Sequence, residues 1–140
     1  MYAEDNSPRA TSPRLLSASN TVHSALRDAI HRIECGDGIE AAFIVGRDGL
    51  LVSLGSPRSQ ADLQAAMAAA VFGAIDRAAA SLDVGDARGA LIETTKGAVQ
   101  ILSLGNHLLV AITSKQANLA TVRALMGKAA CDLARVLSTS

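Results

Sequence analysis

The stretch from Ser59 to Leu82 reads as one helix, and its apolar residues fall on two opposite sides of that helix. At about 100° per residue, the first side collects the larger aliphatic residues, together with two alanines. These are Leu63, Met67, Val71, Ala74, Ile75, Ala78 and Leu82. The second side collects Ala61, Ala65, Ala68, Ala69, Phe72, Ala79 and Ala80, with Asp76 as its only charged residue.

We predict that the first side of this helix packs on a sheet and the second side packs on another helix. Small residues let a second backbone approach closely, and Phe72 would otherwise lie in water. The alternative is a helix that is rich in alanine only because alanine has the highest helix propensity.

Two more helices and five strands are predicted around this central helix. Helical periodicity begins near Ser19 and ends at Gly36, and a last helix runs from Gln116 to Leu137. The strands are predicted at residues 41–45, 50–54, 89–94, 98–104 and 107–113. The inward stripes of the two outer helices are Val22, Leu26, Ala29, Ile30 and Ile33, then Leu119, Val122, Leu125, Met126, Ala129, Ala130, Leu133 and Val136.

Short joints connect the strands within each run. Asp48-Gly49 is a strong hairpin signal, and the joints at 95–97 and 105–106 are equally short. We therefore predict an α+β fold with a five-stranded antiparallel sheet between helices, in the order α-β-β-α-β-β-β-α. Ser59 and Asp62 resemble a capping box at the start of the central helix.

Residues 1–18 are polar, contain Pro8 and Pro13, and show no periodicity, so we expect a flexible tail before a single domain at 19–137. Ser-Pro-Arg occurs at 7–9, 12–14 and 56–58. It is either a phosphorylation motif or a compositional bias.

Composition narrows the function. The 140 residues include 13 basic and 13 acidic ones, and aromatic residues make up 2% of the chain. Without a basic field or rings for stacking, nucleic-acid binding is not expected. The start of the chain lacks a secretory signal, and the longest apolar run, at 65–75, is too short to cross a bilayer. We expect a soluble cytoplasmic protein without membrane insertion.

Candidate catalytic and metal-binding residues are few. No GxxxxGK[ST] motif occurs. His31 and Cys35 are four residues apart on one helix, but two ligands do not complete a zinc site. Cys35 lacks an oxyanion motif, and Cys131 is expected to be a small buried residue. We expect no metal, no cofactor, no catalytic residue and no enzymatic activity.

Five motifs in this order resemble the Roadblock or dynein-light-chain domain in its bacterial and archaeal single-domain form. They are Ala41 to Leu50, Leu63 to Met67, Leu91 to Thr94, His107 to Ile112 and Ala117 to Arg123. The similarity covers residues 19–137. The chain departs from the family at Ala120, where glycine is usual.

The resemblance implies a profilin-like fold and a homodimer in which the central helices pack antiparallel and the strand at 89–94 pairs with its twin. Pairing would also protect an apolar strand edge from aggregation. The expected interface residues are Ala65, Ala68, Ala69, Phe72, Asp76, Ala79, Ala90, Leu91 and Ile92.

The resemblance further implies a small Ras-like GTPase as the partner, which the protein would regulate or localise. Arg58 and Arg77 are candidate partner contacts, and Arg77 could supply an arginine finger. The alternative is that these arginines are solvated or paired within a helix. Two other functions stay open: a dimeric scaffold that leaves nucleotide turnover unchanged, and a sensor of a small molecule.

Overall fold

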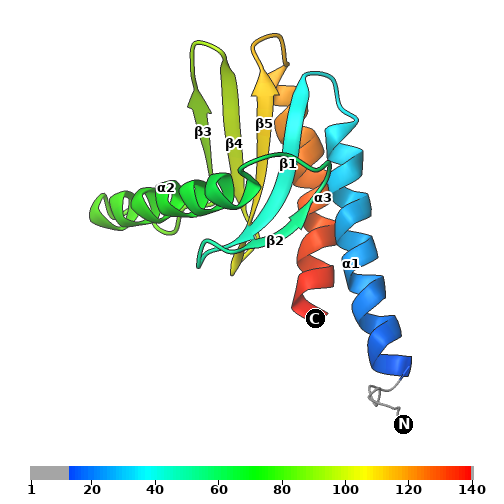
Figure 1. The fold of residues 1–140 in the computed structure, drawn as a ribbon. Helices are drawn as coiled ribbons and strands as arrows, with labels where there is room; N and C mark the ends of the chain where they lie inside the picture. Colours follow the sequence, from blue (N-terminus) through cyan, green and yellow to red (C-terminus); the bar gives the residue numbers. More distant parts are fainter. Residues whose placement is uncertain (1–12, 140) are drawn as a thin grey trace.

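The protein is represented by a computed structural model that describes residues 13–139. Three helices and five strands lie within this range (Figure 1). Their order confirms the predicted α-β-β-α-β-β-β-α. The bounds are α1 (Pro13–Glu34), β1 (Ile39–Gly46), β2 (Leu51–Leu54), α2 (Ala61–Ser81), β3 (Gly89–Glu93), β4 (Gly97–Ser103), β5 (His107–Ser114) and α3 (Leu119–Thr139).

The described strands form one antiparallel sheet in the order β2-β1-β5-β4-β3. β1 and β5 are central neighbours, paired from Ile39↔Thr113 to Gly46↔His107, and β2 and β3 are the edges. α1 and α3 lie side by side on one face of the sheet, and α2 crosses the other face (Figure 1). The α+β class with helices on both sides of an antiparallel sheet is therefore confirmed.

Two apolar layers fill the space between the sheet and its helices. The layer under α1 and α3 contains the predicted inward stripes apart from Leu119, with Ile30, Ile33 and Met126 fully buried. The layer under α2 is smaller and is built around Phe43 and Phe72. Strand residues alternate between these layers, as expected for a sheet that is covered on both faces.

The turn between β1 and β2 has the geometry that Asp48-Gly49 predicts. The Gly46 amide donates to the Leu50 carbonyl at 2.9 Å, and the Leu50 amide donates to Asp48 Oδ1 at 3.1 Å. Gly49 has a φ of 91°, which a residue with a Cβ rarely adopts.

The helix starts differ from the predictions. α1 begins at Pro13, so residues 13–18 are helical and not part of a tail, while residues 1–12 of the predicted tail lie outside the described range. The predicted capping box of α2 is wrong, because the N-cap is Gln60 in a left-handed conformation and makes no side-chain cap bond. α3 begins at Leu119, and Asn118 caps its start, because the Thr121 amide donates to Asn118 Oδ1 at 3.0 Å.

The orientation predicted for α2 is also wrong. Ala65, Ala68, Ala69 and Phe72 are the buried residues of this helix, and they pack on the sheet. Leu63 and Met67, which we expected on the sheet, are 57% and 56% exposed. The small alanine side chains bring the helix backbone close to the strands, and the Phe72 ring fills the space that remains. Close approach through small residues therefore occurs between α2 and its own sheet.

Candidate interaction surface

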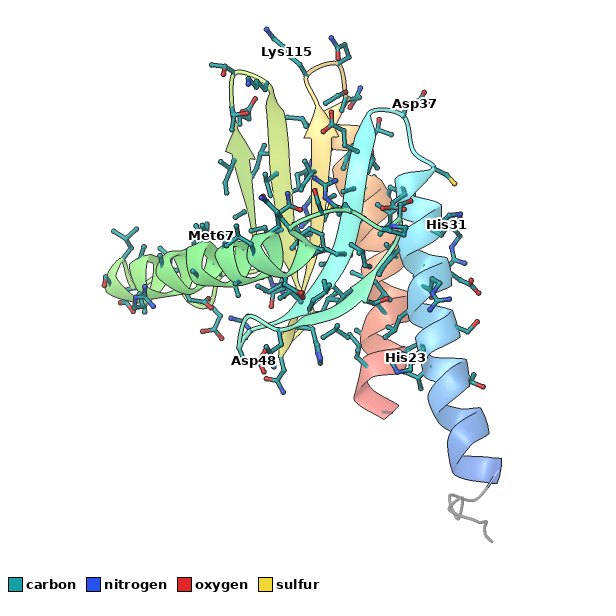
Figure 2. The ribbon with its side chains drawn as sticks, viewed as in Figure 1. His23, His31, Asp37, Asp48, Met67 and Lys115 are labelled. Carbon is teal, nitrogen blue, oxygen red and sulfur yellow. The ribbon has the colours of Figure 1, made fainter. Side chains whose placement is uncertain are left out.

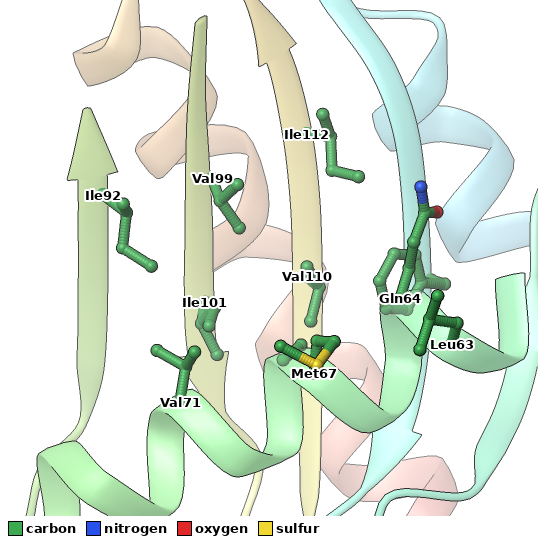
Figure 3. Close-up of a pocket in the computed structure, with 11 residues that line it drawn as sticks. Leu63, Gln64, Met67, Val71, Ile92, Val99, Ile101, Val110 and Ile112 are labelled. Atoms are coloured by element: carbon green, nitrogen blue, oxygen red, sulfur yellow. The ribbon is translucent and has the colours of Figure 1, made fainter. Parts of the chain in front are cut away.

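An apolar groove lies between the exposed side of α2 and the open part of the sheet. Its volume is about 280 Å³. Leu63, Met67 and Val71 line it from α2, and Ile92, Val99 and Ile112 line it from the strands (Figure 3). Gln64 is the one polar residue among those that line it in the described structure. The groove therefore suits an apolar surface and offers little to a charged ligand.

The position of α2 creates this groove. The helix crosses β3, β4 and β5 nearer one end, so the other ends of these strands have no helix in front of them (Figure 1). Met67 projects from α2 on the side of the uncovered strand ends (Figures 2 and 3). Large apolar side chains that are more than half exposed and gathered in one groove are typical of an interaction site.

The groove reaches the β3 edge of the sheet. Among the described strands, β3 pairs only with β4, so its other side is open. Ile92 points into the groove, and Leu91, on the opposite face of the same strand, is 48% exposed. An apolar strand with one unpaired side is a ready template for another strand.

The second half of α2 extends past the sheet (Figure 1). No residue after Phe72 in this described helix is buried. Leu82 and Val84 follow its end and are 73% and 72% exposed. An alanine-rich segment of this length is marginal as a helix without packing, so a neighbouring surface would stabilise it.

The residues predicted for a dimer interface are therefore placed in different environments. Ala65, Ala68, Ala69 and Phe72 lie in the core of the same chain, which is a correction to their predicted role. Asp76 forms an ion pair with Arg47, and Ala79 is half-buried on the overhanging part of α2. Ala90, Leu91 and Ile92 lie on the edge strand as predicted.

Arg47 is a residue that the sequence analysis missed. From the β1–β2 turn it donates to the Gly105 carbonyl at 2.6 Å and to Ser103 Oγ at 2.8 Å. It also pairs with Asp76 of α2, and its guanidinium lies 5.3 Å from the centroid of the Phe72 ring. These partners are far from Arg47 in the sequence, so no local pattern indicates the contacts. The motif Gly46-Arg47-Asp48-Gly49 therefore predicted only a hairpin.

The two arginines proposed as partner contacts lie apart. Arg58 is half-buried and donates to Gln64 Oε1 at 2.9 Å, close to the start of α2. Arg77 is exposed on the second half of α2. At 1.5 Å per residue, the helix alone places Arg77 roughly 24 Å from Ala61 at its start.

The cysteines and histidines do not converge. Cys35 and Cys131 are both exposed, so the expectation that Cys131 is buried is wrong. His31 lies on the outer side of α1 (Figure 2). Within residues 13–139, no group of three or more histidine, cysteine or acidic residues is placed to hold a metal ion. None of the helices in this range is long and apolar enough to cross a membrane.

Comparisons with solved structures define the class of fold. MglB of Myxococcus xanthus is similar with a TM-score of 0.78 and 18% identity, over 84% of this chain and 90% of MglB. Profilin IB of Acanthamoeba castellanii is similar with a TM-score of 0.59 and 15% identity, over 78% of this chain and 96% of profilin. The chain thus has the helix–sheet–helix architecture that profilin and MglB share.

The sequence assigns the family. The Roadblock/LC7 domain model matches residues 26–114, and the chain belongs to this family. Protein MJ0310 of Methanocaldococcus jannaschii is 37% identical over 95 residues, which cover 67% of this chain and 83% of that protein.

Proposed function

We propose that the protein is a homodimeric, non-enzymatic interaction module of the cytoplasm that binds a small Ras-like GTPase and regulates or localises it. One observation carries this proposal: the exposed apolar groove beside α2 is continuous with the unpaired edge of β3. The resemblance to Roadblock domains supplies the class of partner.

A second copy of the chain fits this surface. If two β3 strands pair antiparallel across a two-fold axis, the two sheets become one, and α2 of each copy faces the groove of the other. Leu63, Met67 and Val71 would then lose their exposed apolar surface, and the overhang of α2 would gain a neighbour. MglB, which shares the fold, has been solved in a tetrameric arrangement, and self-association of that protein is compatible with this proposal.

The dimer is tested with Met67→Glu, because a carboxylate in the apolar groove would have to be desolvated. Size-exclusion chromatography with light scattering should give a dimer for the unchanged chain and a monomer for the variant at about 10 μM. Leu50→Glu is the matched control, since Leu50 is 68% exposed and lies outside the groove. A monomer for the unchanged chain, or equal dimerisation of both variants, would contradict the proposed interface.

Arg77 is the better of the two candidate contacts with a GTPase. It is exposed on α2, whereas Arg58 is engaged with Gln64. The test is a pull-down with the intact protein, followed by GTP turnover and exchange assays on the recovered GTPase with Arg77→Ala and Arg58→Ala. Slower turnover with Arg77→Ala at unchanged binding supports an arginine finger. Binding without any effect on turnover or exchange supports the scaffold function instead.

A further inference from the structure

A second groove lies on the opposite face of the sheet and is separate from the one beside α2. Leu91 and Gln100 line it from β3 and β4, and Leu119, Ala120 and Arg123 line it from the first turns of α3. Its volume is about 450 Å³. On this face the helices leave β3 uncovered, and Gly89, Leu91 and Glu93 are all exposed.

Gln100 is the unusual residue of this groove. The residue is only 3% exposed, and its Nε2 donates to the Leu119 carbonyl at 3.0 Å. Because a carbonyl only accepts, the amide atom next to it must be nitrogen, which fixes the orientation of the amide. Oε1 then has no donor among the described residues. Buried acceptors are normally satisfied, so an N–H or O–H that enters the groove would find an unused acceptor in this atom.

Arg123 gives the groove its charge. It is exposed, and none of the described residues that line the groove is acidic. Leu91, Leu119 and Ala120 add apolar surface beside it. The groove therefore combines an apolar wall, one buried hydrogen-bond acceptor and one cation. This combination differs from the α2 groove, where Gln64 is the only polar residue among the described lining residues.

We propose that this groove binds a segment of a second protein that carries an apolar residue next to an acidic one. The apolar side chain covers Leu91 and Leu119, a backbone N–H donates to Gln100 Oε1, and the carboxylate pairs with Arg123. A second copy of this chain that pairs along the β3 edge and covers the α2 groove would leave this face open. The inference thus goes beyond the proposed function and does not depend on dimerisation.

The test is an NMR titration of the full chain, labelled with ¹⁵N, with the blocked peptides acetyl-Leu-Glu-Leu-amide and acetyl-Leu-Lys-Leu-amide. The glutamate peptide should shift the Gln100 side-chain amide and the backbone amides of residues 119–123 in a saturable way. The lysine peptide should bind about five- to tenfold more weakly, because it replaces attraction to Arg123 with repulsion.

Two variants separate the contributions. Arg123→Glu should reverse the preference between the peptides, whereas Lys128→Glu, an identical charge change at an exposed position outside the groove, should preserve it. Gln100→Met, which keeps the length of the side chain and removes the acceptor, should weaken binding about threefold or more. The melting temperature of each variant shows whether it is folded. The proposal is overturned if no saturable shift appears at millimolar peptide, if both peptides bind equally, or if the shifts fall on residues 63–71.

Discussion

Arg47 joins three parts of the chain that are distant in the sequence. Its backbone lies in the β1–β2 turn, its hydrogen-bond acceptors lie at the β4–β5 turn, and its ion-pair partner Asp76 lies on α2. The guanidinium also covers the ring of Phe72. A planar group with five donors can make these contacts together, whereas an ammonium cannot. Arg47 thus fixes α2 against the turns at one end of the sheet.

Arg47→Ala should lower the free energy of unfolding by about 1–2 kcal/mol, since it removes a partly exposed ion pair, two hydrogen bonds and a cation–π contact. The free energy of unfolding of Arg47→Lys should lie between those of the unchanged chain and Arg47→Ala, because lysine keeps the charge but lacks the planar set of donors. Urea unfolding measures these differences. Arg77→Ala is the control and should change the free energy by less than about 0.5 kcal/mol. Equal effects at positions 47 and 77 would show that Arg47 does not hold α2.

Replacing either of two glycines with alanine should change the stability of the fold, but in opposite directions. A Cβ on Gly97, at the start of β4, would overlap the Thr113 carbonyl oxygen, so the backbone of a paired strand would have to shift. A Cβ on Gly127, in α3, would lie 3.6 Å from Arg123 Nη1, an ordinary contact. Gly97→Ala should therefore destabilise the fold by about 1–3 kcal/mol, and Gly127→Ala should stabilise it by up to about 1 kcal/mol. Thermal unfolding of the two variants checks both signs, and destabilisation by Gly127→Ala would show that its Cβ meets more than this ordinary contact.

At the scale of the element, α2 shows what periodicity can and cannot predict. The sequence correctly predicted a helix with two apolar sides. It assigned the wrong side to the sheet, because larger aliphatic residues usually form the core and the alanine side was therefore assigned to a partner. In the structure, Phe72 and the alanines of α2 pack in one buried cluster with Phe43 and other strand residues, whose shapes are complementary to theirs. That complementarity depends on strands that are distant in the sequence.

Substitutions on the two sides of α2 should therefore differ in whether their effect on stability changes with protein concentration. Phe72→Ala removes a fully buried ring from the chain's own core and should cost about 3–5 kcal/mol at every concentration. Met67→Ala should cost little in dilute protein and more in concentrated protein, because Met67 is buried only when a second copy covers it. Chemical unfolding at about 1 μM and 100 μM separates the two behaviours. A concentration-dependent effect of Phe72→Ala would restore the original assignment of the alanine side to an interface.

At the scale of the whole molecule, local signals predicted the elements but not the way in which the two runs of strands join. Hairpin joints gave the β1–β2, β3–β4 and β4–β5 pairs, all of which occur. The pairing of β1 with β5 brings together residues about 70 positions apart, such as Phe43 and Val110, and no turn signals it. The groove on the far side of the sheet was missed for the same reason, since Gln100 and Leu119 meet only after β5 has returned to β4. Periodicity and turn signals supplied the order of the elements, the family resemblance agreed with it, and the side-chain contacts required the structure.

The edge position of β3 leads to a prediction about the whole assembly. In a single chain the amides of residues 89–93 that point away from β4 face solvent, and they should exchange with deuterium almost as fast as in an unfolded peptide. If two chains pair through β3, these amides become hydrogen-bonded, and their exchange should slow at least about tenfold between dilute and concentrated protein. Amides of β1 and β5, at the centre of the sheet, should be protected equally at both concentrations. Met67→Glu should abolish the concentration dependence at β3 and leave the centre unchanged. A dimer by light scattering with no change at residues 89–93 would mean that the copies associate through the α2 groove without extending the sheet.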